Sequence, residues 1–208
     1  MPPINTINHN NGFVKVWKIE ETVDEILAEL QVSDDDLQKV NSFKLVKRKL
    51  EFLCTRCLIS EVIGVYPKIS YLESGKPILE NSDYTISISH TNGFVAVAFT
   101  TNGVPGVDIE YPSDRVMKIA QRFISADEDL FIPVADSNKY YSLIWCIKEA
   151  LYKLLDTEGV IFNEDLLCKP FVISNQGIVN TSVFVNDSTE YINIHYLITP
   201  EYYLAYKV

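Results

Sequence analysis

Segments with strand-like and helix-like spacing of apolar residues follow one another along this chain. Apolar and polar residues alternate one by one in residues 13–19, 84–89 and 94–99, which predicts β-strands. Asn92-Gly93 lies between the last two segments and predicts the turn of a β-hairpin. Beyond Gly159 the alternation returns, between turn sequences, in residues 171–174, 182–185, 191–197 and 202–208. Both ends of the chain are therefore expected to form antiparallel strands.

The segments between these strands have helical periodicity. Apolar residues recur every three or four positions in residues 21–30, 43–64, 113–123 and 140–155. Ser33, Ser113 and Ser125 stand where a helix is expected to begin, and serine is a preferred N-cap residue. The pattern as a whole predicts the α+β class.

The order of the predicted elements repeats. A helix followed by a hairpin describes residues 43–99, and the same order describes residues 140–208. We therefore predict two similar α/β halves, residues 1–103 and 104–208, each a helix packed on an antiparallel sheet. Small-molecule sites tend to lie in clefts between such halves, so we expect a site at this boundary.

Residues 106–110 (Gly-Val-Asp-Ile-Glu) are predicted to form a short strand that carries two carboxylates. Because side chains on a strand alternate faces, Asp108 and Glu110 point the same way, about 7 Å apart along the backbone. Two such carboxylates can bind one hard cation, and Glu149 is the candidate for a third ligand. The alternative is a half-exposed strand with a solvated acidic face.

Two further acidic residues have competing explanations. Trp145, Glu149 and Lys153 are spaced four residues apart and share one face of the helix 140–155. Glu149 and Lys153 could instead form a surface salt bridge worth about 0.3–0.5 kcal/mol. Glu128 follows Ser125 by three residues, which is the capping-box spacing and a complete structural reason for a glutamate there.

The charge distribution points to an anionic ligand. The 208-residue chain has a net charge of −10, which argues against nucleic acid as a general partner. Residues 44–56 nevertheless carry a charge of +4, and Arg48 and Arg56 lie close to one face of a predicted helix. This basic stretch indicates a specific anionic ligand, although a solvated helix face is the commoner meaning of a charge run.

Other basic residues occupy turns and one helix face. Lys76 is at the tip of the turn 73–77, and His90 ends a predicted strand beside Ser89, where an anion could be bound. The spacing of Arg115, Lys118 and Arg122 places them on one face of a predicted helix.

Nothing in the sequence indicates a membrane or secreted protein. No apolar run reaches the ~18 residues that span a bilayer, and the Asn-rich residues 1–12 lack a signal-peptide pattern. The four cysteines, at positions 54, 57, 146 and 168, make no disulfide framework, so we expect buried free thiols and a cytoplasmic location.

Five short motifs together resemble the Sfp-type 4′-phosphopantetheinyl transferases. They are Gly75-Lys76-Pro77, Ser87-Ile88-Ser89-His90, Gly106-Val107-Asp108-Ile109-Glu110, Arg122-Phe123-Ile124-Ser125 with Glu128, and Trp145-Cys146-Ile147-Lys148-Glu149-Ala150-Leu151-Tyr152-Lys153. The resemblance implies two α/β halves related by pseudo-twofold symmetry in one monomer, with coenzyme A and Mg²⁺ in the cleft between them. It also implies transfer of the 4′-phosphopantetheine arm of coenzyme A to a serine of an apo carrier protein, with release of adenosine 3′,5′-bisphosphate.

The resemblance assigns a role to each candidate residue. Asp108, Glu110 and Glu149 would hold Mg²⁺, and Lys148 and Lys153 would neutralise the pyrophosphate. His90, with Lys47 or Arg48, would take the 3′-phosphate, with Lys76, Pro77 and Ser89 near the nucleotide and Arg56 as a further contact. Residues 1–103 would thus form the nucleotide side, and residues 104–208 the metal and pyrophosphate side.

Several choices stay open at this point. The serine proton could pass to Glu149, directly or through a bound water, or to Glu128. The face of Arg115, Lys118 and Arg122 is our hypothesis for docking an acidic carrier protein of the fatty-acid, polyketide or nonribosomal-peptide type. The competing functions are a different phosphoryl transfer or hydrolysis at the same site, and a non-catalytic coenzyme A- or carrier-binding module.

Overall fold

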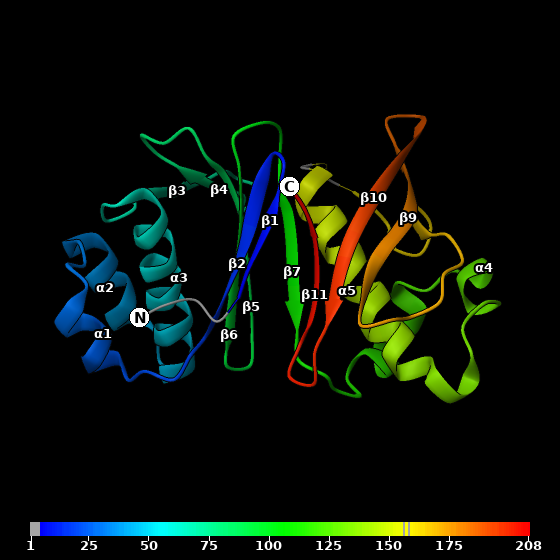
Figure 1. Cartoon of the computed structure of the whole chain (residues 1–208), viewed down its shortest axis with the longest axis horizontal. Coiled ribbons are helices and arrows are strands. Elements are labelled where there is room, and N and C mark those ends of the chain that lie inside the picture. Colours follow the sequence, from blue (N-terminus) through cyan, green and yellow to red (C-terminus); the bar gives the residue numbers. More distant parts are fainter. Residues whose placement is uncertain (1–4, 156, 158) are drawn as a thin grey trace. The chain divides into compact units, whose positions relative to one another are not determined.

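The computed structural model describes residues 5–155, 157 and 159–208 of the chain (Figure 1). It divides into two compact units, Met1–Val104 together with Val208, and Pro105–Lys207. The boundary predicted from the sequence lay after residue 103. Each unit combines helices with an antiparallel sheet, so the predicted α+β class is confirmed.

The first unit packs helices on one side of a sheet (Figure 1). Its strands are β1 (Asn5–His9), β2 (Gly12–Lys18), β3 (Ile69–Tyr71), β4 (Pro77–Leu79), β5 (Thr85–Thr91) and β6 (Phe94–Thr100). Its helices are α1 (Val23–Glu29), α2 (Asp34–Ser42) and α3 (Val46–Ile63). In the described residues the sheet order is β1-β2-β6-β5, all antiparallel, while β3 and β4 pair separately. The long helix α3 packs against β6 and β2, which places its buried side chains in the core of this unit.

Local sequence signals explain where these helices begin and end. Ser33 caps α2 as expected, because its side chain accepts a hydrogen bond from the backbone N–H of Asp36. Thr22 and Glu25 form a reciprocal capping box at the start of α1. Gly64 ends α3 in the left-handed conformation (φ 75°), which glycine adopts without steric cost.

The second unit is organised around one long helix. Its strands are β7 (Gly106–Glu110), β8 (Leu166–Cys168), β9 (Gln176–Val185), β10 (Ser188–Ile198) and β11 (Tyr203–Lys207). Its helices are the 3₁₀ segments η1 (Val116–Arg122) and η2 (Val134–Asp136), the short α4 (Ala126–Asp129) and the long α5 (Ser137–Leu155). The strands form an antiparallel sheet in the order β7-β11-β10-β9-β8 across the described residues. Helix α5 packs against β7 and β11, so the residues of these two strands that face it are buried.

The packing of β7 on α5 depends on Gly106, which has no side chain. A Cβ atom added at Gly106 would lie 2.2 Å from the backbone oxygen of Ala150. Real Cβ atoms do not approach that closely, so any larger residue here would push the strand away from the helix. Gly106 therefore allows the backbone of β7 to lie directly on α5, next to Glu149.

The structure differs from the sequence prediction in several elements, and the short strands β3, β4 and β8 were not predicted. Strand β1 was missed, because its Asn-rich sequence has no regular apolar alternation. Residues 171–174 were predicted to be a strand but have no regular structure; Phe171 packs its ring on Tyr140, 5.4 Å between centroids, and β8 takes the edge of the sheet. The predicted α-helix opened by Ser113 is instead the 3₁₀ segment η1, which follows Arg115 without a side-chain cap.

Two further expectations concern the membrane and the thiols. Within the described ranges, no helix is both long enough and apolar enough to cross a membrane. The cysteines are free thiols, and Cys54, Cys146 and Cys168 are buried. Burial raises the pKa of each thiol above its usual value, to about 11 for the half-buried Cys57, which makes them poor nucleophiles and metal ligands.

Candidate active site

The contact between β7 and α5 gathers carboxylates in the second unit. Asp108 is 4% exposed, in the middle of β7. The ammonium group of Lys153, in the last turn of α5, donates to Asp108 Oδ1 at 2.7 Å and to the backbone oxygen of Val107 at 3.0 Å. Lys153 thus neutralises a carboxylate that the fold has placed out of water.

Glu110, two residues further along β7, is bound by an aromatic residue of the same helix. The indole N–H of Trp145 donates to Glu110 Oε1 at 2.8 Å. Burial raises the pKa of Glu110 above its usual value, the negative charge of Asp108 raises it further, and the hydrogen bond from Trp145 opposes this shift. The charge of Asp108 therefore acts on Glu110, two residues further along the same strand.

Glu149 completes the set from the helix side. Burial raises the pKa of Glu149 to about 7, with smaller raising contributions from Asp108 and Glu110 and an opposing one from Lys153. A carboxylic acid with such a pKa is divided between its two protonation states near neutral pH. The three carboxylates named from the sequence are thus near enough to disfavour one another's charge. We call Asp108, Glu110 and Glu149 the acidic cluster.

The acidic cluster fits a hard divalent cation by the chemistry of its donors. Its members supply carboxylate oxygens, which Mg²⁺ prefers, and a cation would relieve the repulsion that, after burial, contributes to the raised pKa values of Glu110 and Glu149. As their side chains stand, no three His, Cys, Asp or Glu residues in the described part of the chain form a group that could hold a metal ion. Lys153 and Trp145 instead contact oxygens of Asp108 and Glu110, so cation binding would require Lys153 to share or leave Asp108.

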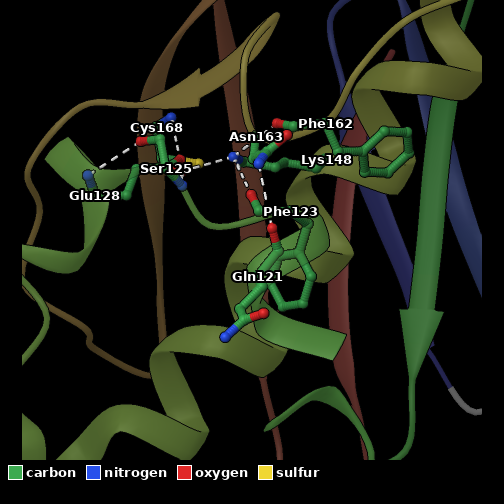
Figure 2. Close-up of polar contacts among 8 residues, drawn as sticks. All are labelled: Gln121, Phe123, Ser125, Glu128, Lys148, Phe162, Asn163 and Cys168. Carbon is green, nitrogen blue, oxygen red and sulfur yellow. Dashed lines mark hydrogen bonds and ion pairs between the residues drawn. The ribbon is translucent and has the colours of Figure 1, made fainter. Parts of the chain in front are cut away.

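Lys148 is placed elsewhere, although it precedes Glu149 in the sequence. Its side chain is 0% exposed, and its ammonium group donates to the backbone oxygen of Phe123 at 2.5 Å, to Glu128 Oε2 at 2.7 Å and to the backbone oxygen of Phe162 at 3.0 Å. Figure 2 shows the backbone oxygens of Phe123 and Phe162 on either side of this group. The structure does not bring Lys148 to the acidic cluster, so its expected contact with a pyrophosphate has no support in this geometry.

Glu128 has the structural role that its capping-box spacing indicated. Its Oε2 accepts from the backbone N–H of Ser125 at 2.9 Å, and its Oε1 accepts from the backbone N–H of Cys168 at 2.8 Å (Figure 2). With Lys148 it forms an ion pair in which both side chains are at most 1% exposed. A carboxylate occupied in this way has no access to a substrate proton, so Glu149 is the better candidate base.

A basic cluster lies in the first unit, where α3 meets β5. The buried carboxylate of Glu51 pairs with Arg48 at 2.8 Å, with Lys47 at 3.7 Å and with Nδ1 of His90 at 3.5 Å. A guanidinium nitrogen of Arg48 also lies 2.7 Å from Nε2 of His90. We call Lys47, Arg48 and His90 the basic cluster; their side chains are 52%, 47% and 38% exposed, so an anion can reach them.

The other residues expected at the nucleotide have different surroundings. Arg56 is 2% exposed, and Asp36 and the ring of Phe52 hold its guanidinium group, at 2.9 Å and at 3.9 Å from the ring centroid. Arg56 is therefore a buried structural residue, and the structure gives no support for its contact with a ligand. Lys76 and Pro77 are half-buried at the start of β4, and Ser89 is buried in β5 next to His90.

The candidate docking residues all lie on the surface of the second unit. Arg115, Lys118 and Arg122 are exposed along the 3₁₀ segment η1, whose last residue is Arg122. The next residue, Phe123, is completely buried. The segment is therefore anchored at its end while its basic side chains face water.

Two residues that contact these clusters, Glu51 and Trp145, were not assigned a role from the sequence. Glu51 was counted only as one negative charge in a basic stretch, although its spacing of three and four residues from Arg48 and Lys47 could have indicated the pairing. Trp145 was placed on the polar stripe of its helix, but its bond to Glu110 joins residues 35 positions apart and has no signal in the sequence.

Comparison with known proteins shows that the second unit is similar to one protein family. A family model described as the 4′-phosphopantetheinyl transferase superfamily matches residues 105–206. This range contains the acidic cluster, the Lys148–Glu128 pair and the segment η1. The basic cluster lies outside it.

Curated relatives match parts of the chain. A Haemophilus influenzae protein, provisionally named as a 4′-phosphopantetheinyl transferase, is 25% identical over 66% of this chain and 62% of its own length. The 4′-phosphopantetheinyl transferase AcpT of Salmonella typhi is 27% identical over 51% of this chain and 58% of its own. The uncharacterized protein YieE of Escherichia coli is 37% identical over 30% of this chain and 28% of its own. The chain thus spans less than two thirds of the length of each of these relatives.

Proposed function

We propose that the protein transfers the 4′-phosphopantetheine arm of coenzyme A to a serine of an apo carrier protein, because residues 105–206 match the family model of the 4′-phosphopantetheinyl transferase superfamily. The observation that carries the proposal is the acidic cluster, in which a strand and a helix of this domain bring Asp108, Glu110 and Glu149 within electrostatic reach of one another. The names of the Haemophilus and Salmonella relatives support the same activity.

The reaction requires a base and positive charge. The serine oxygen forms a bond to the β-phosphorus of coenzyme A, the bond from that phosphorus to the bridging oxygen breaks, and adenosine 3′,5′-bisphosphate leaves. When bound, Mg²⁺ would supply charge stabilisation for the phosphate oxygens, and Asp108, Glu110 and Glu149 would hold it. The serine proton passes to a carboxylate, for which Glu149 is the candidate, directly or through a bound water, because Glu128 is enclosed by its own partners.

Lys153 has a second role in this proposal. Its ammonium group is 27% exposed and lies beside Asp108, so it can turn from that carboxylate towards a phosphate oxygen when a cation joins the acidic cluster. It would then stabilise the negative charge that develops during transfer. Lys148 takes no part in this chemistry, since it is held by the backbone oxygens and by Glu128.

The basic cluster is proposed to bind the 3′-phosphate of coenzyme A. Arg48 supplies a planar donor group, and His90 becomes a second donor when a phosphate takes the place of its contact with Arg48; phosphate is recognised best by such charge-assisted hydrogen bonds. Glu51 pairs with Arg48 and His90, and because Lys47 and Arg48 carry two positive charges against its one negative charge, the group stays net positive with His90 neutral. The first unit is thus assigned to the nucleotide, and Lys76, Pro77 and Ser89 stay candidates for further nucleotide contacts.

The partner of the reaction is proposed to dock on η1. Arg115, Lys118 and Arg122 are exposed basic residues at η1, in the same domain as the acidic cluster, and an acidic helix of a carrier protein has the complementary charge. Charge reversal at Arg122 should weaken carrier binding and leave coenzyme A binding unchanged. Equal loss of both would contradict this assignment.

The proposed activity is tested by measuring the intact mass of a carrier protein before and after the reaction. An apo acyl carrier protein is incubated with coenzyme A, Mg²⁺ and this protein, and its intact mass is measured. A gain of one phosphopantetheine, abolished by Glu149→Ala and by a chelator, is the expected result. The exposed Glu190→Ala variant is the matched control and should retain activity. No mass gain with fatty-acid, polyketide and peptide-synthetase carriers, despite measurable coenzyme A binding, would favour a non-catalytic binding module.

A further inference from the structure

Trp145 connects the helix of the acidic cluster to its strand. It lies four residues before Glu149 and eight before Lys153, on the same stripe of α5. Its indole N–H donates to Glu110 Oε1 at 2.8 Å, whereas Lys153 donates to Asp108 at 2.7 Å. Each strand carboxylate of the cluster therefore has its own donor from one face of α5.

The indole ring is held by two aromatic neighbours. The ring of Phe123 meets it edge to face, 5.1 Å between centroids, and the ring of Phe162 lies tilted against it at 5.6 Å. Aromatic pairs at such distances favour a fixed relative orientation. Rotation of the indole away from Glu110 would disturb both contacts.

These aromatic neighbours are fixed by the same buried ammonium group. The backbone oxygens of Phe123 and Phe162 both accept hydrogen bonds from Lys148, at 2.5 and 3.0 Å (Figure 2). Lys148 itself is anchored by Glu128. Helix α5 thus supplies both the indole and, three residues later, the group that secures the residues around it.

We infer that Trp145 is a positioning residue, which uses its indole N–H to hold one oxygen of Glu110 and so leaves the other oxygen for a divalent cation. The inference rests on the proposed function, since it takes Glu110 as a metal ligand. A donor that engages one oxygen of a ligating carboxylate restricts rotation of the group and directs its other oxygen. Loss of such a contact typically weakens metal binding by about 10- to 100-fold.

The first test measures metal affinity without substrate. Mn²⁺ is titrated into the protein and the free ion is followed by electron paramagnetic resonance, so the readout does not depend on transferase activity. Trp145→Phe retains an aromatic ring but loses the N–H, and its Kd for Mn²⁺ should rise about 10-fold or more. Trp17→Phe is the matched control, because the indole of Trp17 donates to Glu21 in the first unit, and its Kd should equal that of the wild type.

A double-mutant cycle shows whether Trp145 acts through Glu110. In the Glu110→Gln background the ligand is already weakened, so adding Trp145→Phe should change the Kd by less than about 2-fold. A purely structural role would lower affinity by the same factor in both backgrounds. Equal effects in the two backgrounds would therefore overturn the inference.

A second measurement follows the indole N–H signal of Trp145 by NMR and needs no substitution of this residue. The chain contains two tryptophans, so ¹⁵N-labelled protein should give two indole N–H signals, and Trp17→Phe identifies them. Addition of Mg²⁺ should shift the signal of Trp145 and leave that of Trp17 unchanged. This experiment decides the matter if Trp145→Phe fails to fold, and an unmoved Trp145 signal at saturating Mg²⁺ would overturn the inference.

The outcomes separate this inference from the proposed function. If the wild type binds Mn²⁺ and Trp145→Phe binds it equally well, the positioning role is wrong while the transferase proposal stands. If the wild type binds no Mn²⁺, the proposed metal ligands are wrong and the positioning role falls with them. Weaker binding in Trp145→Phe, lost in the Glu110→Gln background, supports both.

Discussion

Lys153 lies 2.7 Å from Asp108 and so ties the last turn of α5 to the centre of β7. The carboxylate is 6% exposed and the lysine side chain 27% exposed, so the pair is only partly screened by water. The same ammonium group opposes the rise in the pKa of Glu149. One lysine therefore balances charge on the strand and on the helix of the acidic cluster.

Removal of Lys153 should destabilise the metal-free protein. Lys153→Met leaves Asp108 buried without its cation, and we expect the free energy of unfolding to fall by about 1–3 kcal/mol at neutral pH. Mg²⁺ should restore part of this loss, because it replaces the missing positive charge. Urea denaturation with and without Mg²⁺ measures both effects.

The matched control is Lys139→Met. Lys139 pairs with Asp136 at 3.3 Å, but both side chains are at least half exposed, so its loss should change stability by less than about 0.5 kcal/mol. Equal effects of the two substitutions would contradict the special role of Lys153.

The stability of the metal-free protein should depend on the protonation of Glu149. The pKa of Glu149 is about 7 in the folded state, above its value of 4.5 in an unfolded chain. Its contribution to stability is therefore complete below about pH 4.5 and is lost as the pH rises through about 7. Glu149→Gln, which cannot ionise, should be more stable than the wild type at pH 8.5 by about 1–3 kcal/mol.

This pH dependence is checked by denaturation between about pH 5 and 9 with a chelator present. Glu190→Gln, at an exposed position of β10, should reproduce the wild-type profile. A wild-type profile as flat as that of Glu149→Gln would show that Glu149 ionises normally.

Arg48 should discriminate between coenzyme A and its 3′-dephospho form. Loss of a charge-assisted hydrogen bond to the 3′-phosphate costs about 1.5–3 kcal/mol, so Arg48→Ala should raise the KM for coenzyme A about 10- to 100-fold. The KM for dephospho-coenzyme A should change little, because that substrate lacks the group. Lys44→Ala, exposed in the same basic stretch, is the control.

Steady-state transfer with both substrates measures this difference. An equal rise of both KM values would indicate that Arg48 supports the fold around Glu51 and does not recognise the phosphate.

Substitution of either partner in the buried Lys148–Glu128 pair should lower the free energy of unfolding strongly, because the other charge stays buried. Lys148→Met leaves Glu128 charged and buried, and Glu128→Gln leaves Lys148 charged and buried; each should cost about 3–5 kcal/mol. The double variant should cost less than the sum of the two, because neither charge remains. Thermal or urea unfolding of the four proteins gives this coupling.

An exposed pair of nearly the same length serves as the control. Lys68 and Glu80 lie 2.8 Å apart, but the lysine side chain is 76% exposed. Lys68→Met should therefore cost less than about 1 kcal/mol. Additive effects at Lys148 and Glu128 would contradict the proposed coupling.

Local patterns predicted much of the fold. The helix α5, the β5–β6 hairpin and the capping box at Ser125 depend on residues close together in the chain, and all three are confirmed. The alternation in β7 likewise predicted that Asp108 and Glu110 share surroundings. Strand β1 escaped prediction because pairing with β2, and not an apolar pattern, holds it in the sheet.

Side-chain partners were harder to predict, because they depend on how elements pack. Lys148 and Glu149 are neighbours in the sequence, but successive residues of an α-helix point about 100° apart, so one faces the core and the other the acidic cluster. The partners of Lys148 come from three separate segments, at Phe123, Glu128 and Phe162. Arg56 was assigned to the ligand for a similar reason: the sequence shows its charge but not its buried partner Asp36.

Gly106 makes the spacing of the acidic cluster a property of the main chain. Since the backbone of β7 lies against the backbone of α5 at Ala150, a side chain at position 106 would increase the separation between the strand that carries Asp108 and the helix that carries Glu149. A substitution at this position would therefore move the carboxylates apart although it touches none of them. For protein engineering, any redesign that keeps the acidic cluster must keep glycine at the crossing point.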